Sequence, residues 1–358
     1  MRIVAHNGAR IWGGAERATV SLLQGLLERG HDVLLLCNSV LVVEQSMARG
    51  VPARLCPIGG DIALHHAWRI RHELEREKPD VFIVGTFKKL FLAALGARMA
   101  GVPRVIARVG LESDTPRSIK YRIALRRWTD GVVVNAERMM QPFQTLSGFD
   151  RSKVTLIWNS VPAPVETQRS RNVRRELRLD DSVFVTGAVA RLSKQKRLDR
   201  LVEAMSQISG AHCVIAGDGK YRDDLAALAA RLGVERRVHL LGERDDVDAV
   251  LDALDVYAVT SDSEGMSNAM LEAMARGLPV VSTDVSGAED ALGEDESGAV
   301  AGIIVPFDST AVAKALQSLR DSTTRRNALA REARLRALTW FSRDKMLTDW
   351  EEFLSQRA

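Results

Sequence analysis

Residues 256–282 read VYAVTSDSEGMSNAMLEAMARGLPVVS, and this stretch decides which fold class the sequence predicts. Its first five residues form a short apolar run of the kind found in buried strands, and residues 279–282 form a second run. Between them, Ser267 is suited to capping a helix and Gly277 to ending one. A strand, a helix and a second strand in this order predict a parallel β-α-β unit.

The same alternation of short strands and helical segments extends over the whole chain. Residues 15–29 and 221–232, for example, carry leucines at the spacing of a helix that covers a sheet. Near-continuous apolar strands are typical of parallel sheets with helices on both faces, the doubly wound arrangement. The predicted strands are 2–5, 33–37, 81–84, 105–107, 132–134 and 154–158 in the first half, and 183–189, 212–216, 238–241, 256–260, 279–282 and 302–305 in the second.

The length of 358 residues and this pattern predict two α/β domains, each a doubly wound, Rossmann-like sheet. Residues 163–175 are rich in charge and lack apolar periodicity, which predicts a linker. We therefore expect a first domain at 1–162, a second at 176–335, and a C-terminal helix within 336–358 that packs back towards the first domain. Two such domains would face each other across a cleft at the carboxyl ends of their strands, where these folds bind ligands.

Composition excludes several classes of protein. Hydrophobic residues make up 46% of the chain and charged residues 27%, which is enough apolar surface for a folded core. No apolar stretch is long enough to cross a bilayer, and no secretory signal begins the chain, so we expect a cytoplasmic protein. Cys37, Cys56 and Cys213 lack the spacing of a metal site, and we expect them to be reduced core residues.

The net charge of +4 conceals a difference between the two halves. Residues 1–165 carry 23 Lys and Arg against 14 Asp and Glu, whereas residues 166–358 carry 27 against 32. Only the first domain is therefore expected to face an anionic partner, a phosphorylated substrate or a lipid surface. Within it, residues 117–128 combine five cations with five large apolar or aromatic residues. This segment is either a helix that rests on an anionic membrane or an ordinary helix with Ile119, Ile123 and Trp128 in the core and solvated arginines outside.

A first candidate site follows the first predicted strand, where residues 6–16 read HNGARIWGGAE. Gly13 and Gly14 would let the backbone approach a ligand at a helix N-terminus, where free N–H groups favour anions. The spacing matches neither GxGxxG nor GxxxxGK[ST], which argues against a dinucleotide-binding loop or a P-loop. A phosphate or sugar contact and a simple turn are the alternatives for this loop.

A second candidate site lies at residues 188–197, AVARLSKQKR, where four cations follow a predicted strand. Cations gathered at the carboxyl edge of a parallel sheet repel one another unless water or an anion neutralises them. This favours an anion site that includes Arg191 and Lys196, with a solvated surface cluster as the alternative. The next strand ends at Gly217, which would allow the backbone to pass close to a ligand.

The third candidate site is the loop of the opening stretch. Glu264 follows a strand end, and Glu272 lies eight residues later on the predicted helix. If the helix begins near residue 267, its free N–H groups attract phosphate beside Glu264. Glu272, about a turn and a half inside, would then reach hydroxyl groups of the same ligand. The other candidate residues of the loop are Gly265, Met266, Ser267 and Asn268.

Glu264 and Glu272 form an E-x7-E motif, and the chain resembles the retaining glycosyltransferases of family 4, the group 1 type with the GT-B fold. The resemblance includes GGAER, VARLSKQKRLDRLVEA, AGDGKYRDDL and GLPVVSTDVSG, and covers residues 1 to about 320. It implies a hexosyltransferase that moves a sugar from a nucleotide-sugar, most often a UDP-sugar, to a glycan or lipid-linked acceptor. The products would be cell-surface polysaccharide, lipopolysaccharide or glycolipid. No nucleic-acid partner is expected.

The resemblance also implies roles for single residues. Arg191 and Lys196 would bind the donor diphosphate, and Glu272 the ribose hydroxyls. Glu264 and the backbone of residues 265–268 would contact the donor sugar and phosphate. Transfer would retain the anomeric configuration, with the donor phosphate taking the acceptor proton. Because cations and a helix N-terminus already oppose the leaving-group charge, we expect no metal ion and no other cofactor.

In one place the chain departs from the family. Members often carry a histidine in the loop after the strand at 105–107, whereas this chain has ARVGLE, so Arg108 and Glu112 are only weak candidates for the acceptor side. Gly14, next to Gly13, would approach the diphosphate from the first domain.

The alternative functions are a non-catalytic nucleotide-sugar-binding subunit and a transferase for a soluble small acceptor. A dehydrogenase would require the GxGxxG turn that the sequence lacks.

Overall fold

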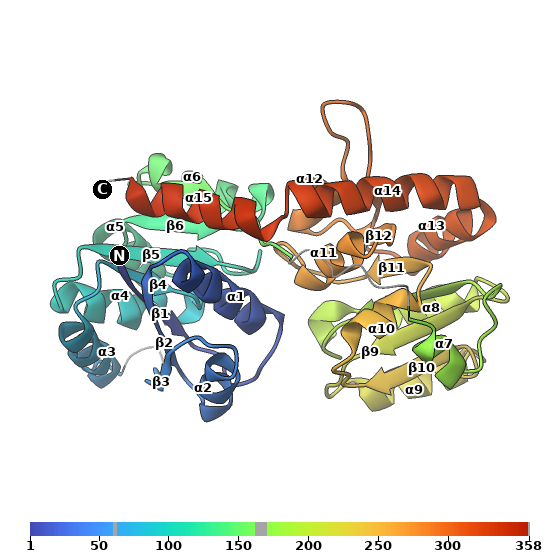
Figure 1. Ribbon diagram of the computed structural model, residues 1–358, viewed down its shortest axis with the longest axis horizontal. Helices are drawn as coiled ribbons and strands as arrows, with labels where there is room; N and C mark the ends of the chain where they lie inside the picture. The colour runs from blue at the N-terminus through green and yellow to red at the C-terminus, as the bar shows by residue number, and fades with distance from the viewer. Residues whose placement is uncertain (60–62, 162–169, 357–358) are drawn as a thin grey trace. The chain divides into compact units, whose positions relative to one another are not determined.

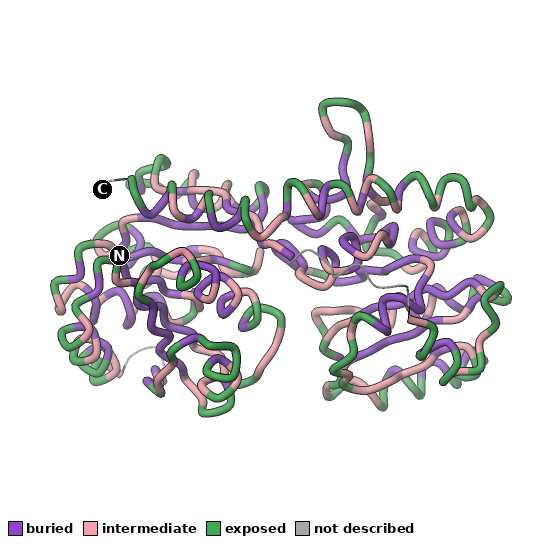
Figure 2. The backbone as a smooth tube through the Cα atoms, in the orientation of Figure 1, coloured by how far each residue is buried: buried purple, intermediate pink, exposed green. Residues whose placement is uncertain are grey.

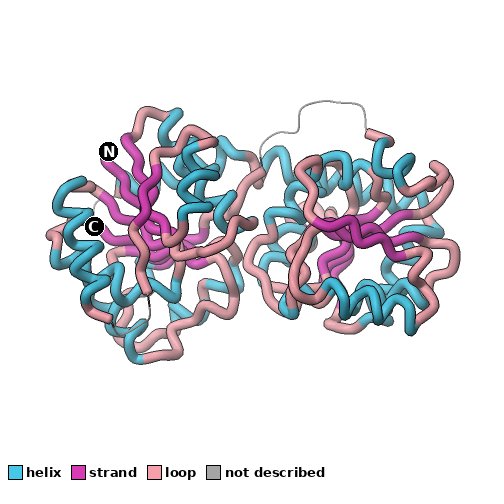
Figure 3. The backbone as a smooth tube through the Cα atoms, turned by 90° about the horizontal axis from the view of Figure 1, so that it is seen from below, coloured by secondary structure: helices cyan, strands magenta, loops and turns pink. Residues whose placement is uncertain are grey.

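The structure of the protein is a computed structural model that describes residues 1–59, 63–161 and 170–356 (Figure 1). The chain forms two compact units. The first consists of Met1–Asn159 together with the chain from Arg343 onward, and the second of Ser160–Ser342. Each unit contains one parallel sheet with helices on both faces (Figure 3). The predicted class of two doubly wound, Rossmann-like domains is therefore confirmed.

The sheet of the first unit consists of β1 (Arg2–Asn7), β2 (Asp32–Cys37), β3 (Ala53–Leu55), β4 (Val81–Val84), β5 (Arg104–Val109), β6 (Gly131–Val134) and β7 (Val154–Leu156). Their order is β3-β2-β1-β4-β5-β6-β7, and all pairs are parallel. Alternate residues enter two separate cores, so that Phe82 and Val84 pack on one face while Val81 and Ile83 pack on the other. Burial on both faces explains the continuous apolar strands, which Figure 2 shows as buried. The edge strand β3 was not predicted, because it is short and partly exposed.

The helices of the first unit are α1 (Gly14–Glu28), α2 (Val40–Met47), α3 (His65–Glu77), α4 (Leu90–Met99), α5 (Ile119–Trp128), α6 (Gln141–Gln144) and α15 (Arg343–Ser355), with 3₁₀ turns η1 (Phe87–Lys89), η2 (Glu137–Met139) and η3 (Arg151–Lys153). The chain returns from the second unit to form α15, which packs against α1. A side chain at Gly25 of α1 would lie 2.5 Å from Leu347, so the glycine makes room for this helix. The sequence placed the start of this C-terminal segment at residue 336, which instead lies in the last turns of a helix of the second unit.

The sheet of the second unit consists of β8 (Val185–Val189), β9 (His212–Ala216), β10 (Val238–Gly242), β11 (Val256–Val259), β12 (Val280–Thr283) and β13 (Gly302–Val305). Their order is β10-β9-β8-β11-β12-β13. From β8 the chain continues outward to β9 and β10. It then returns to form β11 on the other side of β8 and continues outward in the opposite direction to β12 and β13. The strand order therefore reverses between β8 and β11. In open parallel sheets, ligands bind at the carboxyl ends of the strands where the order reverses. All six strands agree with the sequence prediction to within two residues.

The helices of the second unit are α7 (Asn172–Glu176), α8 (Leu198–Ser206), α9 (Arg222–Arg231), α10 (Val247–Asp252), α11 (Asn268–Ala275), α12 (Ser286–Leu292), α13 (Ser309–Asp321) and α14 (Thr323–Thr339), with the 3₁₀ turn η4 (Lys194–Lys196). Residues 256–282 form β11, α11 and most of β12, as predicted. Ser267 caps α11, and its hydroxyl accepts a hydrogen bond from the backbone N–H of Met270 at 3.4 Å.

The predicted linker at 163–175 is wrong in its last part. Residues 162–169 lie outside the described residues, but residues 172–176 form α7, which packs on the second unit. Arg174 of this helix is buried, and its guanidinium donates to the carbonyl of Ala253 at 2.9 Å and to the carboxylate of Asp255 at 3.0 Å. Because this short helix is held by an arginine as well as by Val173, the segment shows no apolar periodicity.

Cys37, Cys56 and Cys213 are buried free thiols, as predicted. Burial raises the pKa of each, to about 11 for Cys56 and about 12 for Cys37, so none is a thiolate at neutral pH.

Within the described part of the chain, no helix has the length and apolar character needed to cross a membrane.

Candidate active site

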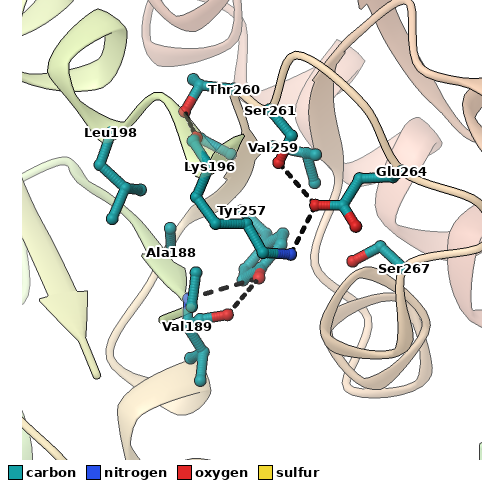
Figure 4. Close-up of a pocket in the computed structure, with 12 residues that line it drawn as sticks. Ala188, Val189, Lys196, Leu198, Tyr257, Val259, Thr260, Ser261, Glu264 and Ser267 are labelled. Atoms are coloured by element: carbon teal, nitrogen blue, oxygen red, sulfur yellow. Dashed lines mark hydrogen bonds and ion pairs between the residues drawn. The ribbon is translucent and has the colours of Figure 1, made fainter. Parts of the chain in front are cut away.

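A pocket opens in the second unit at the point where the strand order reverses (Figure 4). The strands β8 and β11 pair only at Thr186 with Val256 and at Gly187 with Tyr257. Beyond this short ladder their carboxyl ends separate, and the loops that follow them form the walls. The lining residues are Ala188, Val189, Ala190, Lys196, Leu198, Tyr257, Ala258, Val259, Thr260, Ser261, Glu264 and Ser267.

An ion pair between two separate loops forms the charged part of this pocket. Lys196 ends the turn η4 after β8, and its Nζ lies 2.5 Å from Oε1 of Glu264, in the loop after β11. The same Oε1 accepts a hydrogen bond from the hydroxyl of Ser261 at 2.7 Å. Glu264 is 6% exposed. Figure 4 shows the two charged groups pointing towards each other. The sequence thus predicted two residues that the structure brings together, although it did not predict their pairing.

Tyr257 also lines the pocket, and the sequence did not predict it. Its hydroxyl donates to the carbonyl of Val189 at 3.2 Å and accepts from the N–H of the same residue at 3.3 Å. It thereby satisfies backbone groups where β8 and β11 separate. Burial is the main cause that raises the pKa of Tyr257, and the negative charges of Glu272 and Glu264 add to the effect. The phenol is therefore neutral at pH 7.

The N-terminus of α11 lies beside Glu264, which agrees with the prediction. Met266 and Ser267 are buried, and Asn268 begins the helix. The loop in front of the helix is closely packed, because a side chain at Gly287 of α12 would lie 2.6 Å from the carbonyl oxygen of Gly265. The first N–H groups of a helix carry a partial positive charge, so this end of α11 favours an anion.

The remaining predicted residues of the second unit have different surroundings. Glu272 lies on α11, about one turn inside the helix, and is partly exposed. Arg191 is exposed, and it has no hydrogen bond or ion pair with any described residue. The exposed guanidinium of Arg191 is open to solvent, whereas Lys196 is already paired with Glu264.

Gly217 has a structural explanation that the sequence did not predict. Its φ is +130°, and a side chain there would lie 2.0 Å from the carbonyl oxygen of Ala190. The N–H of Ala190 also donates to the carbonyl of Ala216 at 2.9 Å. The close approach that requires this glycine is therefore made by the loop after β8. Gly217 supports the loop that carries Arg191 and Lys196.

The predicted residues of the first unit lie at the start of α1, on β5 and in the loop after β5. Gly13 is the N-cap of α1 and Gly14 its first residue. Arg108 of β5 donates to the hydroxyl of Thr19 at 2.9 Å and to the side-chain oxygen of Asn159 at 3.1 Å. Burial lowers the pKa of Arg108 to about 10, so it remains a cation.

Glu112 lies in the loop after β5, and one of its carboxylate oxygens is 4.0 Å from the guanidinium of Arg138. No group of three or more His, Cys, Asp or Glu side chains with the geometry of a metal site is found among the described residues.

Comparison with protein families gives two matches that together span most of the chain. The model described as glycosyl transferases group 1 matches residues 169–336, which contain the pocket. The model described as glycosyltransferase family 4 matches residues 12–163 of the first unit. Each unit is thus matched by a separate model, and both models describe glycosyltransferases.

Among curated proteins, the chain is 26% identical to the lipopolysaccharide core biosynthesis glycosyltransferase LpsE of Rhizobium meliloti, over 96% of each chain. It is also 32% identical to the D-inositol 3-phosphate glycosyltransferase of Mycolicibacterium smegmatis, over 48% of this chain and 41% of that protein. Among solved structures, Anabaena HepE in complex with UDP matches with a TM-score of 0.85 and 20% identity. That match covers 99% of this chain and all of HepE, and it shows a common fold.

Proposed function

Because the chain belongs to the group 1 glycosyltransferases of the family 4 type, with the GT-B fold, we propose that it transfers a sugar from a UDP-sugar to a glycan or lipid-linked glycan acceptor. The observation that carries the proposal is the Lys196–Glu264 pair at the N-terminus of α11. A cation, a carboxylate and a helix N-terminus in one pocket suit a ligand that has both a diphosphate and a sugar.

The chemistry follows from the charge that develops in the reaction. When the bond between the sugar and the diphosphate breaks, negative charge grows on the leaving phosphate and positive charge on the anomeric carbon. Lys196, Arg191 and the N–H groups of α11 would stabilise the phosphate, and groups placed in this way each lower a barrier by roughly 3 to 4 kcal/mol. The carboxylate of Glu264 would orient the sugar and stabilise its positive charge.

We place retention of the anomeric configuration within the same proposal. The acceptor hydroxyl would attack on the face from which the diphosphate leaves, and its proton would pass to the departing phosphate oxygen. The bond to the phosphate breaks, the bond to the acceptor oxygen forms, and no covalent enzyme intermediate is needed. Glu272, on the next turn of α11, would hold the ribose hydroxyls.

The nature of donor and acceptor rests on the relatives. HepE was crystallised with UDP and with UDP-glucose, and LpsE is a lipopolysaccharide core biosynthesis glycosyltransferase. A UDP-sugar donor and an acceptor from cell-surface polysaccharide, lipopolysaccharide or glycolipid synthesis are therefore our proposal for this chain. The acceptor would bind to the first unit, where Arg108 offers a cation and the net charge is positive.

Peripheral binding to an anionic membrane is also part of the proposal, through the basic helix α5. The alternative, a helix with Ile119, Ile123 and Trp128 in the core, holds only for Trp128, which packs against the core beside Phe91. Ile119 and Ile123 are 67% and 37% exposed. Ala124 and Leu125 are buried instead. Arginines and isoleucines thus share the exposed surface of α5, which is the pattern of a helix that lies on a lipid surface.

A panel of nucleotide-sugars tests the proposal, with release of the nucleoside diphosphate measured with and without acceptor. We expect one UDP-sugar to be turned over, and turnover to rise when the acceptor is added. Binding without turnover of any donor would favour the non-catalytic subunit, and transfer to a small soluble acceptor would favour the alternative substrate class.

The enzyme should keep its activity when the same assay is run in EDTA, because Lys196, Arg191 and α11 oppose the phosphate charge. Loss on chelation with recovery in Mg²⁺ would contradict this part.

A further inference from the structure

We infer that Asp262 is a positioning residue, which holds the two loops of the pocket together through Arg197 and Arg200 and so fixes Lys196 against Glu264. This inference rests on the proposed function, because it assigns a role within the same site. None of the three residues lines the pocket. Their effect on the reaction would therefore pass through the pair that does.

Hydrogen bonds already align the two loops, including one from the side-chain amide of Gln195 to the carbonyl of Ser263 at 2.7 Å. The Lys196 loop follows β8 and the Glu264 loop follows β11, and the ladder between these strands ends before either loop begins. Lys196 itself is tied by its backbone, since its carbonyl accepts a hydrogen bond from the hydroxyl of Thr260 at 3.1 Å. The N–H of Asp262 donates to the carbonyl of Gln195 at 2.9 Å. These hydrogen bonds align the backbones, but they leave the charged ends to be held by side chains.

Asp262 supplies this further connection through two arginines. Its Oδ1 lies 2.6 Å from Arg200 and 3.3 Å from Arg197. Arg200 is 7% exposed, and it also donates to the carbonyl of Thr260 at 3.0 Å. Arg200 thus holds the Glu264 loop at two points, the backbone carbonyl of Thr260 and the carboxylate of Asp262. Charge-assisted hydrogen bonds of this kind are the strong ones in proteins.

Arg197 adds a backbone observation to this arrangement. It directly follows Lys196, and its φ of +46° lies in the left-handed region, which residues other than glycine rarely adopt. Its guanidinium is held by Asp199 at 2.9 Å and by Asp262 across the gap. The ion pairs therefore stabilise a backbone conformation that sets the direction of Lys196. A residue in such a conformation persists only where its surroundings determine it strongly.

Asp262→Asn tests the inference, because it keeps the size of the side chain and the backbone hydrogen bond to Gln195 while it removes the charge. We expect kcat to fall by about 10- to 100-fold, as for other misplacements of catalytic groups, with a smaller loss of UDP affinity measured by calorimetry. Asp321→Asn is the matched control, since Asp321 is also a partly exposed carboxylate paired with an arginine of the second unit, Arg320. It should leave both quantities unchanged.

A double-mutant cycle separates positioning from general stability. If Asp262 acts through Lys196, then Asp262→Asn should add little to the loss already caused by Lys196→Ala, in kcat and in UDP affinity alike. Arg197→Gly removes the ion pair but suits the left-handed backbone, so kcat should fall several-fold while the melting temperature stays near that of the parent protein. Arg197→Ala should lower both kcat and the melting temperature, because it removes the ion pairs without relieving the left-handed backbone conformation.

Two results would overturn the inference. Full additivity in the cycle would show that Asp262 does not act through Lys196, and unchanged kcat in both Asp262→Asn and Arg197→Gly would show that the two loops need no such connection. Failure of the proposed function looks different. In that case the parent protein itself would neither bind a nucleoside diphosphate nor turn over any donor.

Discussion

At the scale of single residues, the pocket is organised by one shared oxygen. Oε1 of Glu264 contacts both Lys196 and Ser261, so the cation and the carboxylate neutralise each other before a ligand arrives. A diphosphate would compete with Glu264 for Lys196, and a sugar hydroxyl would compete with Lys196 for Glu264. Binding of the phosphate end of the donor is therefore expected to release Glu264 for the sugar end.

Glu264→Gln tests this competition. The amide has the size of the carboxylate but no charge, so it should abolish transfer while UDP binds about 1 kcal/mol more tightly, since one negative charge beside the diphosphate is gone. Isothermal calorimetry measures the affinity, and Lys196→Gln is the reciprocal variant, for which affinity should fall. Loss of UDP binding in Glu264→Gln would mean that the carboxylate itself holds the nucleotide.

Glu272 offers a second test at the residue scale. Replacing it by alanine should weaken binding of nucleoside diphosphates by roughly 1 to 3 kcal/mol, because hydrogen bonds to two ribose hydroxyls would be lost. Calorimetry with UDP checks this, with the exposed Glu235→Ala as the control. Equal affinities in Glu272→Ala and the parent protein would remove Glu272 from the site.

His6 predicts a pH dependence of stability in the first unit. Its side chain is fully buried on β1, and burial lowers its pKa from 6.5 to about 4, while Nε2 lies 3.3 Å from the carbonyl oxygen of Cys56. Below pH 6.5 the unfolded chain binds a proton at His6 that the folded protein does not bind. The free energy of unfolding is therefore highest above pH 6.5 and falls by about 3 kcal/mol as the pH is lowered towards 4. His6→Gln should flatten this dependence in urea denaturation between pH 7 and 4. The same slope in both proteins would contradict the prediction.

At the scale of elements, α5 is the helix whose exposed side needs an explanation. Ile119, Ile123, Arg122, Arg126 and Arg127 are exposed together. The helix has no acidic residue, and the side chains of Arg122 and Arg126 reach backbone carbonyls rather than carboxylates. The positive charges of Arg122, Arg126 and Arg127 are therefore exposed to an external anionic surface.

We expect the protein to sediment with anionic vesicles at low salt and less so at physiological salt, since each cation near the surface contributes about 1 kcal/mol. Replacing Arg122, Arg126 and Arg127 by glutamine should abolish this binding. The matched control replaces three exposed cations of the second unit, Lys314, Arg325 and Arg331. Binding that is absent in the parent protein, or equal in the two variants, would show that α5 does not recruit the enzyme and would favour a soluble acceptor.

At the scale of the whole molecule, the last helix belongs to the unit that begins the chain. Trp350 of α15 is 1% exposed, and Phe353 fills a place beside Gly131, where a side chain would lie 2.8 Å from the ring. Arg29, the C-cap residue of α1, holds the same helix through Glu351 at 2.6 Å. The first unit is therefore complete only when the end of the chain has been made.

Trp350→Ala should lower the free energy of unfolding of the first unit by about 3 to 5 kcal/mol, because it leaves a large cavity under α15. Hydrogen exchange of the strands of each sheet reads the two units separately. The control is Trp340→Ala, since Trp340 is 37% exposed and belongs to the second unit. Equal protection of the first sheet in the two variants would mean that α15 adds little to its stability.

Much of this molecule was determined by the sequence alone, because the signals are local. Apolar runs predicted twelve of the thirteen strands that the described residues form in the two sheets, and Ser267 predicted the start of α11. The E-x7-E spacing placed Glu264 in the loop after a strand and Glu272 on the helix that follows. Each of these features depends on residues within a few positions of one another, where spacing and capping chemistry are readable.

Only the tertiary structure decided which distant residues meet. Lys196 and Glu264 are 68 positions apart, and they pair because β8 and β11 are neighbours in the sheet. The same strand order brings Asp262 to Arg200 and the hydroxyl of Tyr257 to Val189. The dockings of α7 and α15, and the exposure of Ile119, likewise depend on what packs beside each element. Strand order and packing are properties of the folded chain, and no local pattern of residues encodes them.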